Sequence, residues 1–121
     1  MFDTTAASIE FIRAGRLRAL AVTPAMRSEA LPDVPAMGDF VPGYEAIGWY
    51  GAAAPKDTPT DIVERLNREI TAALADATVK ARLADLGAEP MPMTPVEFGR
   101  FVVEEAEKWG KVVKFAGIKP E

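Results

Sequence analysis

The sequence predicts an α/β fold that is rich in helices and holds one small mixed sheet. Two features of the 121 residues support this prediction. The segment 17–22 has five apolar residues in six, which is the continuous pattern of a strand buried on both faces. Two later segments open with Thr-Pro and continue with apolar residues at helical spacing, which is typical of amphipathic helices.

The composition allows one folded domain, or part of one, and excludes several classes of function. Hydrophobic residues make up 49% of the chain and charged residues 26%, which is typical of a folded globular protein. A net charge of −4 gives no electrostatic reason to bind nucleic acid. The chain has no Cys and no His, which excludes Cys and His catalysis and the common zinc sites. We therefore expect that the chain is not an enzyme. We also expect that it holds no cofactor and no metal and that it does not bind nucleic acid.

The first 22 residues predict a helix followed by a strand. The helix covers residues 6–14, between an N-cap at Thr4 or Thr5 and a left-handed end at Gly15. The strand at 17–22 follows it. In a βαβ unit a strand also precedes the helix, and almost no residues remain here to supply it. We therefore expect the chain to begin inside such a unit.

The middle of the chain predicts an irregular connection and a second strand. Residues 23–43 contain four prolines and two glycines, which forbid a long helix and leave room for a short turn at 36–39. Irregular segments of this length are unusual within a domain, so we expect this one to cross between lobes or to wrap a surface. Residues 44–54, rich in aromatic and small side chains, predict a strand that ends at Pro55.

The C-terminal half predicts three helices. They cover residues 58–75, 76–87 and 94–116, and each starts at a capping residue, Thr-Pro for the first and third and Asp for the second. Residues 88–93 contain two prolines and predict an extended segment at a sheet edge.

The last helix carries a run of acidic and basic side chains. We expect Glu104 to pair with Lys108 and Glu107 with Lys111, because residues four apart are neighbours on a helix surface. Glu105 is expected to be solvated with them. No catalytic group is predicted among these side chains.

Arginines and aromatic residues have a structural and a functional interpretation. Arg13, Arg16, Arg18 and Arg27 form a basic cluster. The cluster could bind a carboxylate, although ordinary surface charge is the more frequent role. Trp49 and Tyr50 are expected to pack against neighbouring elements, with ligand stacking as the alternative. We expect Phe101, Trp109 and Phe115 to lie in the core.

The candidate ligand site precedes the first helix. In an open α/β sheet, ligands bind beyond the carboxyl ends of the strands, where the next helix offers unpaired backbone N–H groups and its positive dipole end to an anion. Phe2, Asp3 and Thr4 occupy that position. The alternative is that Asp3 or Thr4 simply caps the helix.

A series of motifs in one order carries a family likeness. The motifs are IRAGRLRALAVT (12–23), LPDVP (31–35), PGYE (42–45), WYG (49–51), AP (54–55), IVERLN (62–67), LGAEP (86–90) and WGKVV (109–113). Through them the chain resembles the C-terminal portion of the Bug family, the extracytoplasmic solute receptors of tripartite tricarboxylate transporters. The likeness covers essentially all of the sequence.

The resemblance implies a type II periplasmic-binding-protein fold with two lobes that close on a small carboxylate and deliver it to a membrane permease without chemistry. Residues 1–43 would be a remnant of the second lobe with the return linker, and residues 44–121 the C-terminal part of the first lobe. In the family a Met-Phe-Asp segment ends a strand beside the cleft and is often followed by Asn. Phe2 and Asp3 match that segment here, and Thr4 takes the place of the Asn.

The resemblance also implies a periplasmic location. The residues at the start of the chain, with an acid at position 3 and no apolar h-region, are not expected to form a signal peptide. Because most ligand-contacting loops of such a receptor would lie upstream, we expect carboxylate binding to be weak or lost. We also expect a homo-oligomer that pairs the exposed edges 17–22 and 44–54. The alternative function is a stand-alone oligomerisation or interaction module without ligand binding.

Overall fold

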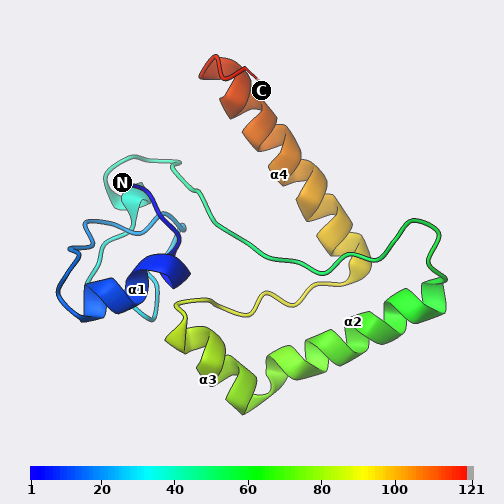
Figure 1. The fold of residues 1–121 in the computed structure, drawn as a ribbon. Helices are drawn as coiled ribbons and strands as arrows, with labels where there is room; N and C mark the ends of the chain where they lie inside the picture. Colours follow the sequence, from blue (N-terminus) through cyan, green and yellow to red (C-terminus); the bar gives the residue numbers. More distant parts are fainter. Residues whose placement is uncertain (120–121) are drawn as a thin grey trace. The chain divides into compact units, whose positions relative to one another are not determined.

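The computed structural model describes residues 1–119 (Figure 1). Its elements in chain order are α1 (Thr5–Arg13), a short 3₁₀ helix η1 (Met37–Asp39), α2 (Thr60–Ala75), α3 (Ala77–Asp85) and α4 (Pro95–Phe115). The chain divides into two compact units. The first unit holds Met1–Ala53 and Ala73–Pro90, and the second holds Ala54–Ala72 with the residues from Met91 onward. None of the helices within residues 1–119 is long and apolar enough to cross a membrane.

All three predicted C-terminal helices are present, and two of them start at the predicted caps. The Asp76 carboxylate accepts the N–H groups of Thr78 and Val79 at 2.8 and 3.0 Å and so begins α3. Thr94 begins α4. The helix predicted from 58 starts later, because the Thr58 hydroxyl donates to the Pro55 carbonyl at 2.8 Å and α2 begins only at Thr60.

The start of α4 is a complete capping box. The Thr94 hydroxyl accepts the backbone N–H of Glu97 at 3.2 Å, and the Glu97 carboxylate accepts the N–H and the hydroxyl of Thr94, each at 2.8 Å. These hydrogen bonds, the backbone one first, hold the pKa of the Glu97 carboxyl below its ordinary value of 4.5. A lowered folded-state pKa means that the ionised form stabilises the folded state.

We expect this stabilisation to be complete above about pH 4.5 and to be lost as the pH falls through the lowered pKa of Glu97. In Glu97→Gln the titrating charge is absent. Urea unfolding followed by circular dichroism should therefore show a stability difference between the two proteins at pH 7 that shrinks as the pH falls below 4.5. A difference that is constant over the acid range would contradict the role of the carboxylate charge.

The predicted N-terminal helix and its glycine end are confirmed. α1 ends in a Schellman motif, in which Gly15 N–H donates to the Ile12 carbonyl at 3.0 Å and Arg16 N–H donates to the Phe11 carbonyl at 2.8 Å. Gly15 adopts φ +68°, the left-handed conformation that glycine adopts without steric cost. The expected turn at 36–39 is also present, as η1.

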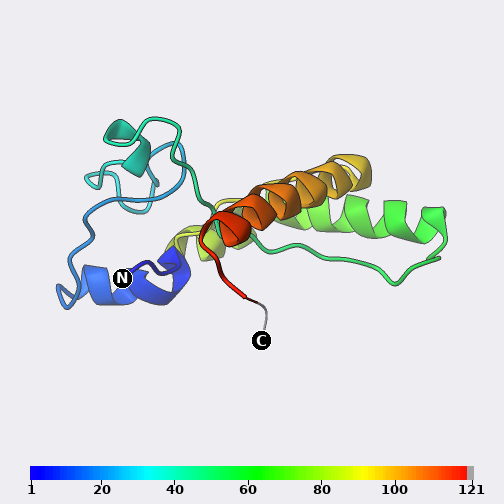
Figure 2. The same cartoon turned by 90° about the horizontal axis from the view of Figure 1, so that it is seen from above.

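The predicted mixed sheet is not confirmed. Residues 1–119 contain no β-strand, and neither view of the ribbon draws a strand arrow (Figure 1, Figure 2). The segment 17–22 makes one isolated parallel bridge, in which Val22 N–H donates to the Pro35 carbonyl at 2.9 Å and Val22 O accepts from Met37 N–H at 2.7 Å. Segments 44–54 and 88–93 are extended without ladder partners. A strand needs a neighbouring strand to satisfy its backbone, and these residues do not supply one to each other.

The buried apolar core is small and belongs to the first unit. Among residues 1–119 it consists of Ile9, Val22 and Ala36. Two of the three aromatic residues expected in the core are not there, because Phe115 is 95% exposed and Trp109 is 40% exposed. Phe101 is half-buried and stacks on Phe98, with ring centroids 6.5 Å apart. The amphipathic pattern of α4 therefore predicted a helix correctly but not what the helix packs against.

Candidate functional site

The three predicted site residues lie together at the N-terminal end of α1. Thr4 is the N-cap, with φ −73° and ψ 145°. The Asp3 carboxylate accepts the N–H of Thr4 at 2.8 Å, which fixes the approach of the chain to the helix. The Phe2 side chain is exposed. A short extended segment therefore precedes a helix, and an acid holds the cap residue in place.

The first turn of α1 has open donors. The Thr4 carbonyl accepts the N–H groups of Ala7 and Ser8 at 3.1 and 3.2 Å. The Thr4 side chain makes no capping hydrogen bond. Within residues 1–119 no acceptor meets the N–H groups of Thr5 and Ala6. These N–H groups therefore remain available to water or to an anion.

Glycines from two other segments of the first unit pack against this helix end. A side chain at Gly48 would meet the Thr4 methyl at 3.6 Å, so the two segments are neighbours. Gly87, at φ +67°, lies against the side chains of Thr5 and Ile9. Arg13 strengthens the α1–α3 contact by donating to the Asp85 carbonyl at 3.1 Å. The open donors are thus carried by a helix that α3 holds from one side.

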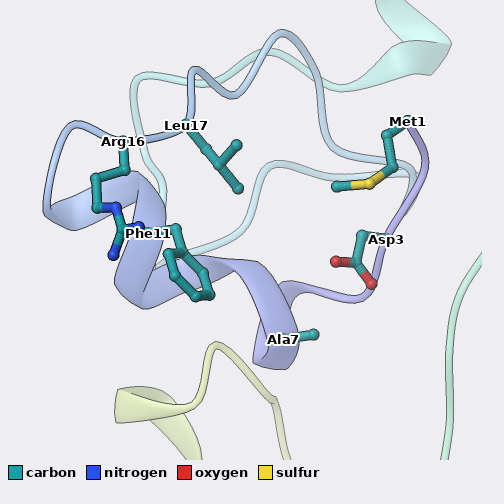
Figure 3. Close-up of a pocket in the computed structure, with 6 residues that line it drawn as sticks. All are labelled: Met1, Asp3, Ala7, Phe11, Arg16 and Leu17. Carbon is teal, nitrogen blue, oxygen red and sulfur yellow. The ribbon is translucent and has the colours of Figure 1, made fainter.

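An open depression of about 280 Å³ lies along the same helix (Figure 3). It is lined by Met1, Asp3, Ala7, Phe11, Arg16 and Leu17. The side chains of Met1 and Leu17 point toward one another across it, and the Asp3 carboxylate points into it. The Arg16 guanidinium lies 5.2 Å from the centre of the Phe11 ring. Of the three predicted site residues, only Asp3 lines this depression, while Phe2 and Thr4 do not.

The predicted arginine cluster does not act as one group. Arg13 pairs with Glu10 at 3.0 Å, and Arg27 lies 3.8 Å from Asp39. Arg16 lies over an aromatic ring instead. The surface-charge interpretation therefore describes these three arginines better than a shared carboxylate grip.

The structure corrects the interpretation of the acidic run on α4. Glu105, expected to be solvated, is 8% exposed. Its carboxylate accepts Lys108 Nζ at 2.6 Å and Trp109 Nε1 at 3.0 Å. Lys108 thus pairs with the residue three positions before it, not with Glu104 as predicted. The sequence spacing could have indicated the hydrogen bond between Glu105 and Trp109. Glu105 lies four residues, about one helical turn, before Trp109, and an indole N–H usually has a hydrogen-bond acceptor.

The two aromatic neighbours near the middle of the chain differ in burial. Trp49 is half-buried, as expected for packing, whereas Tyr50 is 90% exposed. Among residues 1–119, no three His, Cys, Asp or Glu side chains are grouped so that they could hold a metal ion. The described residues that line the depression offer one acid, Asp3, and one guanidinium, Arg16, beside the open backbone donors of α1.

The sequence matches the family described as tripartite tricarboxylate transporter family receptor over residues 1–118. Protein BugT of Bordetella pertussis is 39% identical over 114 residues, which are 93% of this chain and 35% of BugT. The UPF0065 protein in the clcB-clcD intergenic region of Pseudomonas knackmussii is 34% identical over 115 residues, which are 93% of this chain and 68% of that protein. The chain thus spans about a third of the length of BugT, and about a third of the UPF0065 proteins from Pseudomonas sp. (strain P51) and Agrobacterium vitis.

Solved structures of similar proteins superpose on most of this chain. Rpa4515 of R. palustris, solved with adipate, superposes with a TM-score of 0.86 at 40% identity, over 97% of this chain and 40% of Rpa4515. The periplasmic binding protein BugD superposes with a TM-score of 0.82 at 32% identity, over 94% of this chain and 39% of BugD. The Bug-family resemblance is therefore confirmed, and with it the periplasmic-binding-protein relationship of the fold. The chain belongs to the tripartite tricarboxylate transporter family receptors.

Proposed function

We propose that this chain is the part of a periplasmic solute receptor that contacts a small carboxylate through the first turn of α1. Residues 1–43 would belong to the second lobe with the return linker, and residues 44–121 to the first. Phe2, Asp3 and Thr4 are the proposed ligand-contacting residues. The cargo would pass to a membrane permease. Family membership and the adipate in the similar Rpa4515 structure support this proposal.

The open N–H groups of Thr5 and Ala6 carry the proposal. A carboxylate at a helix N-terminus gains hydrogen bonds from such groups and a favourable interaction with the helix dipole. The Thr4 hydroxyl, which makes no capping bond, is a third donor at the same place. Asp3 would act by fixing the Thr4 N–H, and the exposed Phe2 ring would offer an apolar face to a ligand chain.

Thr5→Pro tests these donors with little cost to the helix. Proline is tolerated at the first helical position because its missing N–H has no partner within the helix. The Thr4 backbone, at φ −73° and ψ 145°, already has the conformation that a residue before proline requires. Thr5→Ala is the matched control, since it loses the same side chain but keeps the N–H.

The readout is an NMR titration of amide signals with adipate. One cleft edge supplies few preorganised contacts, so we expect weak binding, on the order of a millimolar Kd. The shifts should centre on Thr5 and Ala6, and Thr5→Pro should weaken binding about tenfold relative to Thr5→Ala, because a charge-assisted hydrogen bond is lost. Equal affinities for the two variants, or shifts confined to other elements, would overturn the proposed site.

A second candidate role, self-association, is favoured by the surface of the chain. The accessible area is 9757 Å². Two separate compact bodies sharing this mass would expose only about 7,700 Å². The surplus includes large apolar side chains such as Leu20, Met26 and Phe40, which are all exposed. We infer that the 121-residue chain forms a homo-oligomer.

Size exclusion with light scattering at micromolar concentration checks this inference. We expect a dimer, with twice the 13.0 kDa mass of one chain. A standard protein interface buries about 800 Å² on each partner. The exposed area beyond that expected for compact bodies of this mass is large enough for such an interface. A single 13.0 kDa species with cooperative unfolding would contradict self-association.

A further inference from the structure

We draw no further inference here: the strongest candidate, the open depression along α1 that is lined by Asp3, Arg16 and apolar side chains, belongs to the site already described, and nothing in the structure shows what covers its apolar lining.

Discussion

Gly87→Ala should destabilise the first unit by about 2–5 kcal/mol. Gly87 closes α3 in a Schellman motif, with its own N–H donating to the Ala84 carbonyl at 2.9 Å and the N–H of Ala88 donating to the Leu83 carbonyl at 2.9 Å. Its φ of +67° is unfavourable for alanine by roughly 1–2 kcal/mol. An added methyl would also overlap the Thr5 side chain and approach Ile9 Cδ1 to 3.1 Å. Overpacking of that kind adds about 1–3 kcal/mol.

Gly15→Ala separates the two contributions. Gly15 ends α1 in the same motif at φ +68°, and nothing lies within 4 Å of a methyl built there. This variant should therefore lose only about 1–2 kcal/mol. Urea unfolding followed by far-UV circular dichroism measures both. Equal losses at the two sites would mean that the contact between α3 and the first turn of α1 is not tight in solution.

Glu105→Ala should lower the free energy of unfolding by about 1–2 kcal/mol. The substitution removes the acceptor of the Trp109 indole N–H at 3.0 Å and the carboxylate that holds Lys108 at 2.6 Å. The side chain of Lys108 is 37% exposed and can return to water, which limits the cost. The indole loses its partner at a place where the removed carboxylate was almost fully buried. Urea unfolding measures the loss, and Trp109 fluorescence should shift with it.

Two variants show whether the effect is specific to this hydrogen bond. Glu105→Gln keeps an oxygen acceptor for the indole and should lose less than Glu105→Ala. Glu104→Ala removes the acid that sequence spacing pairs with Lys108, and it should change stability by less than about 0.5 kcal/mol because no such pair forms. A larger loss for Glu104→Ala than for Glu105→Ala would reverse the assignment of the ion pair.

The helices could be predicted from sequence because their signals are local. Asp76 and Thr94 satisfy N–H groups two or three residues away, and Gly15 and Gly87 end helices through hydrogen bonds within a few residues. Local hydrogen bonding of this kind does not depend on the rest of the fold. The position of Phe2, Asp3 and Thr4 before α1 followed from the same local signals.

Only the tertiary structure decided the properties that depend on distant partners. The pattern at 17–22 is that of a buried strand, but a strand forms only when another strand completes its hydrogen bonds, and residues 1–119 provide Val22 with a single bridge. The spacing of charges on α4 could not distinguish Glu104 from Glu105 as the partner of Lys108, because both lie within reach on a helix. Burial of Glu105 and its bond to Trp109 settled the choice. Likewise, the sequence predicted Thr4 as a candidate N-cap residue, but its side chain makes no capping hydrogen bond. The N–H groups of Thr5 and Ala6 therefore have no acceptor within residues 1–119. Capping depends on the orientation of the side chain, which the sequence alone does not determine.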